Sequence, residues 1–180
     1  MSLGYLQPDD SAPIIWRGPM LLKALQQLLH DVAWGGLDVL VLDLPPGTGD
    51  IQLSIAQQVE LAGAVVVTTP HVLAVKDAVR GVGMFEKVGV PVLGVVRNMG
   101  VFVCPCCGER TEVFGGKEGV EEMCRERGIE VLADVPLHRS IGEDGSRGKP
   151  TVVAEPGSER AGVFMELARR VAGKVGLEVS

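Results

Sequence analysis

Short apolar runs recur along the chain, and they predict strands that are buried on both faces of a sheet. Each run is rich in Leu or β-branched residues, is apolar nearly throughout rather than at alternate positions, and is bounded by Gly, Pro or Asp. That pattern is typical of parallel sheets with helices on both faces. The predicted strands are Leu37–Asp43, Gly63–Thr69, Val90–Arg97 and Glu130–Val135.

Helical periodicity fills the stretches between these runs. Apolar residues three or four positions apart mark a helix face from Leu21 to Val32, another from Val72 to Val82, and a third from Phe164 to Val175, for which Ser158 is the expected N-cap. A shorter helix follows the first strand, with Ile51, Ile55 and Val59 on one face. Strands that alternate with helices imply right-handed crossovers, so the sequence predicts an α/β fold with a doubly wound, mostly parallel sheet.

Composition fits this fold and excludes some classes of protein. The chain has 180 residues, of which 46% are hydrophobic, so it is long enough for one domain with a real core. The net charge is -6 and Lys and Arg do not cluster, which argues against a nucleic-acid partner. No apolar run reaches the ~20 residues of a membrane span, and no targeting segment is visible, so we expect a soluble intracellular protein.

An acidic, glycine-rich segment follows the first predicted strand. The strand ends in Asp43, and the next residues, Pro45-Pro46-Gly47-Thr48-Gly49-Asp50, predict a tight turn before a helix. A carboxylate at the carboxyl end of such a strand lies where open α/β sheets bind ligands, and it suits Mg²⁺ beside a phosphate. The alternative is structural: Asp43 is a turn residue and Asp50 a helix cap.

Three cysteines form the second candidate site, in the segment Gly100–Gly119, which breaks the strand–helix rhythm. Cys104-Pro105-Cys106-Cys107-Gly108 has the spacing of a metal knuckle, in which two thiolates on one tight turn point at one metal. A tetrahedral or cluster site needs about four ligands, so two chains that each give Cys104 and Cys107 would complete it across a two-fold axis. Cys106 could replace a neighbour or stay spare.

Other interpretations of the cysteines remain open at this point. Thiolates alone suit either zinc or a [4Fe–4S] cluster, and a structural zinc knuckle is the strongest alternative. A thioredoxin-like redox pair is weaker, because polar loop residues rather than a helix follow the motif. Cys124 lies alone in an apolar helical pattern and is expected in the core. His30, His71 and His138 are scattered and are expected to be solvated or structural.

The phosphate-binding motif G-x-x-x-x-G-K-[ST] does not occur in the 180 residues. Gly115-Gly116-Lys117 is followed by Glu118, and Gly148-Lys149 is followed by Pro150, which has no N–H to offer a phosphate. These residues alone therefore contain no cradle for a triphosphate.

Taken together, the motifs resemble those of the Mrp-type, or nucleotide-binding-protein-like, P-loop ATPases that carry iron–sulfur clusters. The resemblance runs from near residue 1 to about residue 175, and the Asp43–Ser54 string followed by CPxC is highly specific. The matching segments, in order, are Trp16–Met20, Asp43–Ser54, Thr69-Pro70, Asn98-Met99, Cys104–Cys107, Phe114-Gly115 and Pro136-Leu137.

The resemblance implies a role for each candidate residue. Asp43 would be the catalytic acid near Mg²⁺ and the attacking water. The switch that senses the γ-phosphate of ATP would run from Pro45 to Asp50, and its candidate contact residues are Pro45, Gly47, Thr48 and Asp50. Asn98 would contact adenine, and Arg17 would lie in the other switch segment. Cys104 and Cys107 would hold a [4Fe–4S] cluster between two subunits.

The resemblance also implies a function and a fold of the P-loop NTPase type. The chain would be a dimeric, ATP-dependent carrier that hands a [4Fe–4S] cluster to apo-proteins, in the mitochondrial matrix or the cytoplasm. The resemblance places it nearer the bacterial and mitochondrial branch, whose mitochondrial members assist assembly of respiratory complex I. An alternative is a zinc- or cluster-binding module without ATPase activity that pairs with a full-length relative. A partitioning or septum-site ATPase ranks lower, because it does not explain the cysteines.

The chain departs from the family pattern at its start. The family's first strand and P-loop are not in this sequence, so the resemblance implies one N-terminally truncated domain over residues 1–180, with a metal-binding excursion at about 100–119. In the family that first strand pairs beside Leu37–Asp43, which would here expose an edge. Gly100 and His71 stand where Ser and Gln are usual, and nothing is inferred from them.

Overall fold

The computed structural model describes residues 1–6 and 18–177, and the chain divides into two compact units, Met1–Ile55 and Ala56–Ser180. The first unit contains the 3₁₀ turn η1 (Leu3–Leu6), helix α1 (Gly18–His30) and the start of helix α2 (Asp50–Gln58). Both predicted helices are thus confirmed. After α1, the indole Nε1 of Trp34 donates a hydrogen bond of 3.1 Å to the carbonyl of Leu29 and closes the helix end.

The prediction of a strand over Leu37–Asp43 is wrong. The segment has no strand pairing, and most of its side chains are exposed, with Val41 at 84%. A strand needs a neighbour that takes up its backbone N–H and C=O groups, whatever the character of its side chains. Within the described residues this segment has no such neighbour, so its apolar run stays an extended loop.

The second unit is built on a sheet whose central strand is β2 (Val92–Val103). Strand β1 (Ala64–Thr68) pairs with one side of β2 and β4 (Val131–Leu137) with the other, both in parallel. The short strand β3 (Arg110–Thr111) pairs antiparallel with the end of β2. The parallel strands predicted from their apolar runs are confirmed, although β2 continues to Val103, well beyond its predicted end at Arg97.

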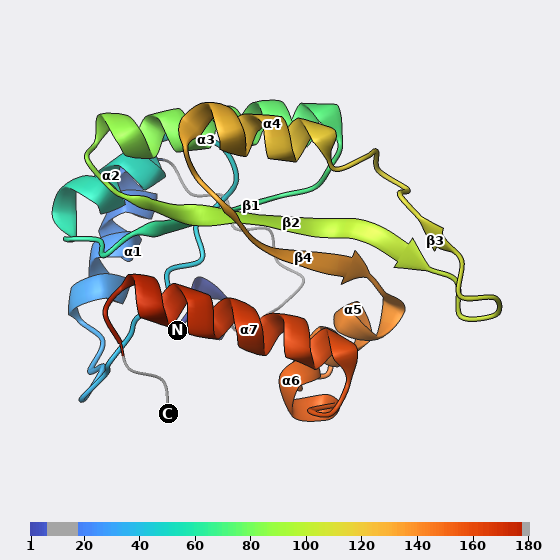
Figure 1. The fold of residues 1–180 in the computed structure, drawn as a ribbon. Helices are drawn as coiled ribbons and strands as arrows, with labels where there is room; N and C mark the ends of the chain where they lie inside the picture. The colour runs from blue at the N-terminus through green and yellow to red at the C-terminus, as the bar shows by residue number, and fades with distance from the viewer. Residues whose placement is uncertain (7–17, 178–180) are drawn as a thin grey trace. The chain divides into compact units, whose positions relative to one another are not determined.

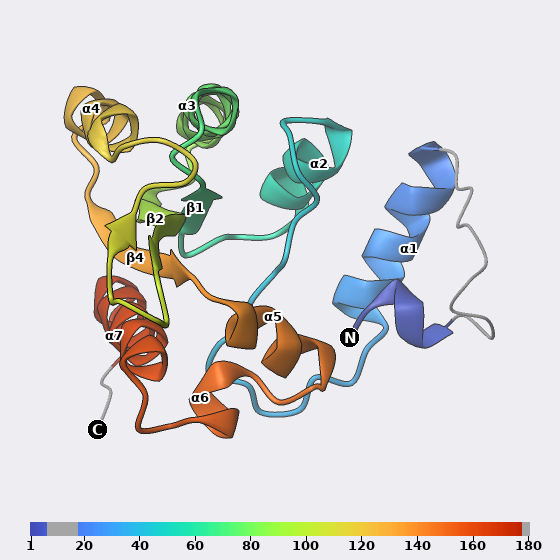
Figure 2. The same ribbon diagram turned by 90° about the vertical axis from the view of Figure 1, so that its right-hand side faces the viewer.

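Helices cover both faces of this sheet, as Figures 1 and 2 show. Helices α3 (Val72–Lys87) and α4 (Glu118–Arg127) lie side by side on one face, and α7 (Glu159–Lys174) lies on the other, against β4. The doubly wound α/β prediction is therefore confirmed for residues 56–177. The parallel strands all point the same way, so their carboxyl ends share one edge of the sheet (Figure 1).

The core explains why these strands are apolar throughout. Neighbouring residues of β2, Val95 and Val96, are both buried, one toward each layer of helices. On the α7 face Val96 packs with Leu132 and Val135 of β4 and with partly buried residues of α7, namely Val163, Phe164, Leu167 and Val171. The helix predicted from Phe164 to Val175 is confirmed with this apolar face against the sheet.

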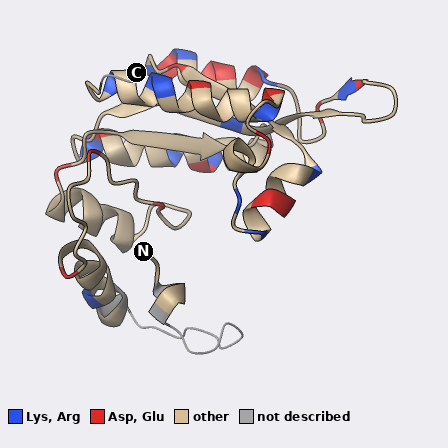
Figure 3. Ribbon diagram, turned by 90° about the horizontal axis from the view of Figure 1, so that it is seen from below, with Lys and Arg blue, Asp and Glu red and all other residues tan. Residues whose placement is uncertain are grey.

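Charged residues lie on the outer faces of these helices. Figure 3 shows acidic and basic residues interspersed along them, and several pair one turn apart, as Lys117 does with Glu121 at 3.4 Å. At the end of α7, Lys174 and Arg170 both contact Glu130. The hydrogen bond from Lys174 is the main reason that the pKa of Glu130 lies below its usual value. No helix in the described ranges is long and apolar enough to cross a membrane.

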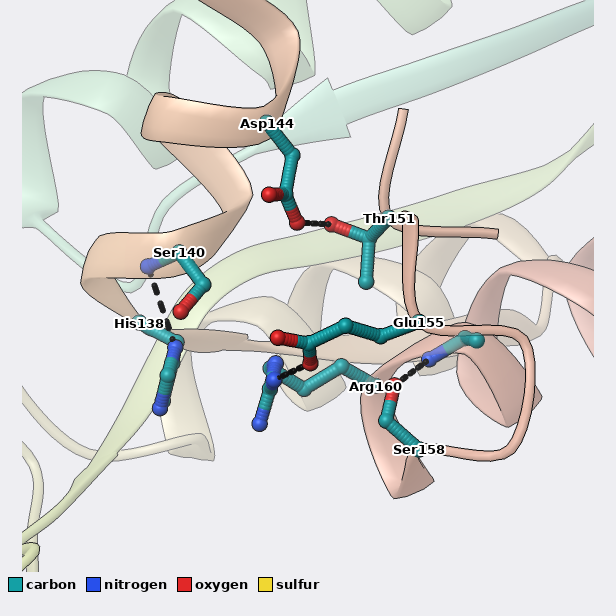
Figure 4. A network of polar contacts seen from close by, with 8 residues as sticks. His138, Ser140, Asp144, Thr151, Glu155, Ser158 and Arg160 are labelled. Atoms are coloured by element: carbon teal, nitrogen blue, oxygen red, sulfur yellow. Dashed lines mark hydrogen bonds and ion pairs between the residues drawn. The ribbon is translucent and has the colours of Figure 1, made fainter. Parts of the chain in front are cut away.

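Two short helices, α5 (Arg139–Ser146) and α6 (Thr151–Ala154), join β4 to α7. Figure 4 shows the polar contacts of this corner. The hydroxyl of Thr151 donates a hydrogen bond of 3.0 Å to the buried carboxylate of Asp144. Ser158 caps α7, as predicted, because its Oγ accepts a 3.1 Å hydrogen bond from the N–H of Ala161.

Candidate metal centre

The cysteine motif lies in the turn of a β-hairpin at the carboxyl edge of the sheet. We call residues 102–111 the cysteine hairpin; its arms are the end of β2 and β3, with Phe102 opposite Thr111 and Val103 opposite Arg110. The hairpin projects from the rest of the second unit, at the right of Figure 1. The first part of the predicted excursion is therefore a hairpin that continues the central strand, and an irregular loop over residues 112–117 follows it.

Hydrogen bonds within the turn give it the form of a knuckle. The N–H of Cys104 donates to the carbonyl of Glu109, and the N–H of Gly108 donates to the carbonyl of Cys104, both at 2.9 Å. Gly108 has φ of +73°, in the left-handed region that residues with a Cβ rarely adopt. The glycine thus lets the chain reverse directly after Cys107, as the sequence predicts.

The turn also favours the thiolate form of Cys104. Backbone N–H groups of Cys107 and, next, of Cys106 donate toward its sulfur and lower the pKa of Cys104 below its ordinary value. Cys104 is half-buried, whereas Cys106 and Cys107 are exposed. Metal binding requires deprotonated sulfur, so this backbone arrangement suits a metal ligand.

The fourth cysteine has the opposite environment. Cys124 lies in α4, is 4% exposed and packs in the core on the α3 and α4 face of the sheet. Desolvation, followed by the nearby charge of Glu121, raises the pKa of Cys124 above its ordinary value. The interpretation of Cys124 as a core residue is confirmed.

These environments predict a clear order of thiol reactivity. In the reduced, metal-free chain at pH 7, iodoacetamide should alkylate Cys104, Cys106 and Cys107 long before Cys124, because only the thiolate reacts. The rate at Cys104 should reach half its maximum at a lower pH than for an ordinary thiol, since its pKa is lowered. Tandem mass spectrometry of quenched time points measures the order of alkylation and the pH dependence of the rate at Cys104. Labelling of Cys124 at the rate of the hairpin thiols would contradict the burial.

The turn offers two candidate metal ligands, Cys104 and Cys107, and not a complete site. Among the described residues no three or more His, Cys, Asp or Glu side chains are grouped so that they could hold a metal. His71 and His138 are instead helix caps: the Nδ1 atom of His71 accepts from the N–H of Leu73 at 3.3 Å, and that of His138 from the N–H of Ser140 at 3.2 Å. The structural interpretation of these two histidines is confirmed.

Asn98 is the candidate residue that β2 itself carries. It is half-buried, lies opposite Val135 of β4, and marks the carboxyl end of the regular parallel pairing. Just before it, Arg97 and Asp134 are paired across the two strands, with Arg97 Nε 3.0 Å from Asp134 Oδ1. One strand thus carries both Asn98 and the cysteine hairpin.

The acidic loop belongs to the first unit. Asp43, Pro45 and Thr48 are exposed, and Gly47 has φ of +95°, as a tight turn at this position needs. The side chain of Gln52, which is 4% exposed, donates from Nε2 to the carbonyl of Pro45 at 2.7 Å and holds the loop against the first turn of α2.

Sequence reasoning gave Gln52 no role of its own. An apolar helix face marked by Ile51 and Ile55 gives no sign that the Gln between them is buried. Asp50 begins α2, and Arg17 lies outside the described residues. The structure therefore places Asn98 on β2 and the cysteines in the turn that follows the same strand, and Asp43, Pro45, Gly47 and Thr48 together in one loop of the other unit.

Comparisons with known proteins point in one direction. Residues 1–172 match the ParA-type family described as NUBPL iron-transfer P-loop NTPases. The chain is 47% identical over 171 residues to the mouse iron–sulfur cluster transfer protein NUBPL, which covers 95% of this chain and 53% of that protein. It is 51% identical over 174 residues to the iron–sulfur cluster carrier protein of Salmonella typhimurium. That alignment covers 97% of this chain and 47% of the relative.

A solved structure is similar as well. It is the nucleotide-binding protein of Archaeoglobus fulgidus in complex with ADP, in which cobalt was found; the TM-score is 0.67 and the identity 36%, over 81% of this chain and 58% of that one. The predicted fold class, an α/β fold of the P-loop NTPase type, is therefore confirmed. The chain spans about half the length of the curated relatives it matches.

Proposed function

Because this chain belongs to the family of NUBPL-type iron-transfer P-loop NTPases, we propose that it carries a [4Fe–4S] cluster as cargo and hands it to apo-proteins. Two copies would share the cluster, each through Cys104 and Cys107. Membership of the family supports the carrier class, and the hairpin geometry supports the site.

The observation that carries this proposal is the half-site on the cysteine hairpin. Its knuckle directs two sulfur atoms from one turn, and the backbone N–H groups around Cys104 favour the thiolate. A [4Fe–4S] cluster takes about four thiolates, so two such turns complete one cluster. In a homodimer with its two-fold axis through the cluster, the same turn of each copy would provide two of the four thiolates.

Exposure of the hairpin suits a carrier more than a permanent site. Cys107 and Cys106 are exposed, and the turn lies at the end of a projecting hairpin. Thiols of an apo-protein can therefore approach and replace the carrier's ligands one at a time. We propose residues 100–119 as the metal-binding element of a P-loop NTPase-like domain to which residues 1–180 belong.

Nucleotide roles are proposed for the whole protein. The acidic loop suits Mg²⁺ and a phosphate, with Asp43 as the catalytic acid and the switch residues Pro45, Gly47, Thr48 and Asp50 after it. Asn98 would contact adenine. Arg17 would belong to a second switch segment. The phosphate-binding motif itself is not among these residues, so they do not fit ATP by themselves. When bound, Mg²⁺·ATP would supply the phosphoryl chemistry of the family.

Anaerobic reconstitution of the purified chain with iron and sulfide tests the carrier proposal. The expected result is about two irons and two sulfides per chain, because one [4Fe–4S] cluster is divided between two chains. Light scattering under the same conditions should show a dimer that reverts to monomer when a chelator removes the iron. An apo-protein with an empty four-cysteine site should then gain the cluster from the loaded dimer.

Two outcomes would count against it. Zinc bound in place of iron, with no gain of iron after removal of the zinc, would favour the alternative of a structural knuckle or a non-catalytic module. About four irons per chain on a monomer would show that this chain completes the site without a second copy.

A further inference from the structure

The central strand β2 is interrupted between Asn98 and the cysteine hairpin. Asn98 pairs with Val135 and Phe102 pairs with Leu137, so three residues of β2, Met99 to Val101, stand opposite one residue of β4, Pro136. We call Met99–Val101 the bulge. Bulges bend a strand and change the direction of the residues after them, and they occur next to functional sites.

The backbone of the bulge is held in an unusual conformation. Met99 has φ of +57° and is the non-glycine residue with positive φ among those the structure describes. Such a conformation is unfavourable for a residue with a Cβ, and it persists where the surrounding structure fixes it. Pro136 lacks an N–H and so does not donate a ladder hydrogen bond at the point where the bulge departs.

An ion pair between β2 and β4 lies directly before this bulge. Arg97 and Asp134 are directly opposite each other in the register of β2 and β4. The Arg97 guanidinium donates from Nε to Asp134 Oδ1 at 3.0 Å and from Nη2 to Oδ2, and the Arg97 side chain is only 12% exposed. A two-pronged contact of this kind fixes the direction of both side chains.

Gly100 is the residue that makes room for the pair. A Cβ at Gly100 would lie 2.0 Å from Asp134 Oδ1 and 3.0 Å from Arg97 Nε, which no real side chain tolerates without a shift. The carboxylate therefore rests directly on the backbone of the bulge. The ion pair and Gly100 are thus packed against each other beside Met99, between the sheet and the hairpin.

We propose that Arg97 and Asp134 are positioning residues of the metal centre: by closing on Gly100 they hold the bulge in one conformation and so fix the direction in which β2 presents Cys104 and Cys107. This inference rests on the proposed function, since it assigns a device that serves the shared site. Neither residue touches the metal.

The length of the arm shows why direction matters. Cys104 lies five positions after Met99, which is about 16 Å of extended strand at roughly 3.3 Å per residue. A change of about 10° at the bulge would then move the sulfur by about 3 Å, more than the roughly 2.3 Å of a metal–thiolate bond. Two hairpins that share one cluster, or one cobalt ion, must each be directed more narrowly than that.

Cobalt(II) binding to the reduced, metal-free chain provides the test, because thiolate–cobalt charge-transfer bands report both affinity and ligand geometry. Arg97→Lys keeps the charge and removes the two-pronged contact, and Gly100→Ala displaces the carboxylate without touching a charge. Each is expected to weaken cobalt binding at least tenfold and to alter the bands. Backbone amides of residues 101–103 should also exchange hydrogen faster in the metal-free variants than in the wild type.

Arg127→Lys is the matched control. Arg127 makes a similar ion pair, Nη1 to Glu86 Oε2 at 2.7 Å, between α4 and α3 rather than beside the hairpin. It should leave cobalt binding and exchange at residues 101–103 unchanged. Urea unfolding of every variant distinguishes a changed direction of the cysteine hairpin from a general loss of stability.

The outcomes separate the two proposals. If Arg97→Lys and Gly100→Ala fold and bind cobalt with wild-type affinity and bands, the positioning role is overturned while the shared site stands. If Arg127→Lys weakens binding as much as Arg97→Lys, the effect is general destabilisation, and the positioning role is overturned as well. If the wild-type chain binds no cobalt through its hairpin thiols, the proposed function fails together with this inference.

Discussion

Replacing both Cys104 and Cys107 with Ala is expected to reduce the iron bound after anaerobic reconstitution from about two per chain to background. The two sulfurs are the half-site that each copy contributes, and no group of three or more possible metal ligands exists among the described residues to replace them. The visible charge-transfer bands of the cluster should disappear with the iron, and the dimer that depends on the cluster should revert to monomer. Iron and sulfide assays with light scattering measure all three.

The fold should survive this change. Cys107 is exposed and Cys104 is half-buried in a projecting turn, so the free energy of unfolding should change by no more than about 0.5 kcal/mol. Urea unfolding of the metal-free proteins measures this.

Two single variants are matched controls for the double variant. Cys106→Ala removes a thiol from the same turn, and Cys124→Ala removes the thiol from the core. Both should keep the full iron content, although the second should lower stability because the site is buried. A double variant that retained its iron would end the proposal for this pair, and loss of iron in Cys106→Ala alone would move the ligand to Cys106.

The parallel strands of the second unit could be predicted because burial on both faces leaves a direct trace in the sequence. Val95 and Val96 are neighbours and both buried, as expected of a strand between two helical layers. Helix ends were equally visible where a side chain makes the cap, as Ser158 does. The short helices α5 and α6 carry too few turns to show a period.

Leu37–Asp43 shows the limit of the same argument. Its apolar run resembles β1 and β2, yet a strand exists only when a neighbour accepts its backbone hydrogen bonds. Side-chain pattern records which faces a segment can bury and says nothing about whether that neighbour is present. The prediction failed on pairing rather than on propensity.

The candidate site divides in a similar way. The spacing of Cys104 and Cys107 with Gly108 is local, so the turn they form could be predicted from a few consecutive residues. The Arg97–Asp134 pair joins residues that are far apart in the sequence, and it depends on the register of β2 against β4. Gln52 required knowledge of how the loop before α2 folds back on that helix. Contacts of this kind need the structure.

Leu132→Ala is expected to lower the free energy of unfolding by about 2–5 kcal/mol, the range for large-to-small changes in well-packed cores. Leu132 is 2% exposed and lies at the centre of the cluster that joins Val96, Val135 and the apolar face of α7. Urea unfolding followed by far-ultraviolet circular dichroism measures the change through the midpoint, with an unchanged slope.

The cost of Leu132→Ala should fall in the upper part of that range, because the space left behind cannot easily close. The side chain of Leu132 lies against the backbone of Gly94, where a Cβ would come within 2.4 Å of Leu132 Cγ. On that side only a paired strand faces the cavity, and backbone in a ladder relaxes less than side chains do. Leu73→Ala is the matched control, since Leu73 is 64% exposed and should change stability by no more than about 0.5 kcal/mol. Equal losses in the two variants would mean that the α7 face of β4 is not the tightly packed layer that this structure shows.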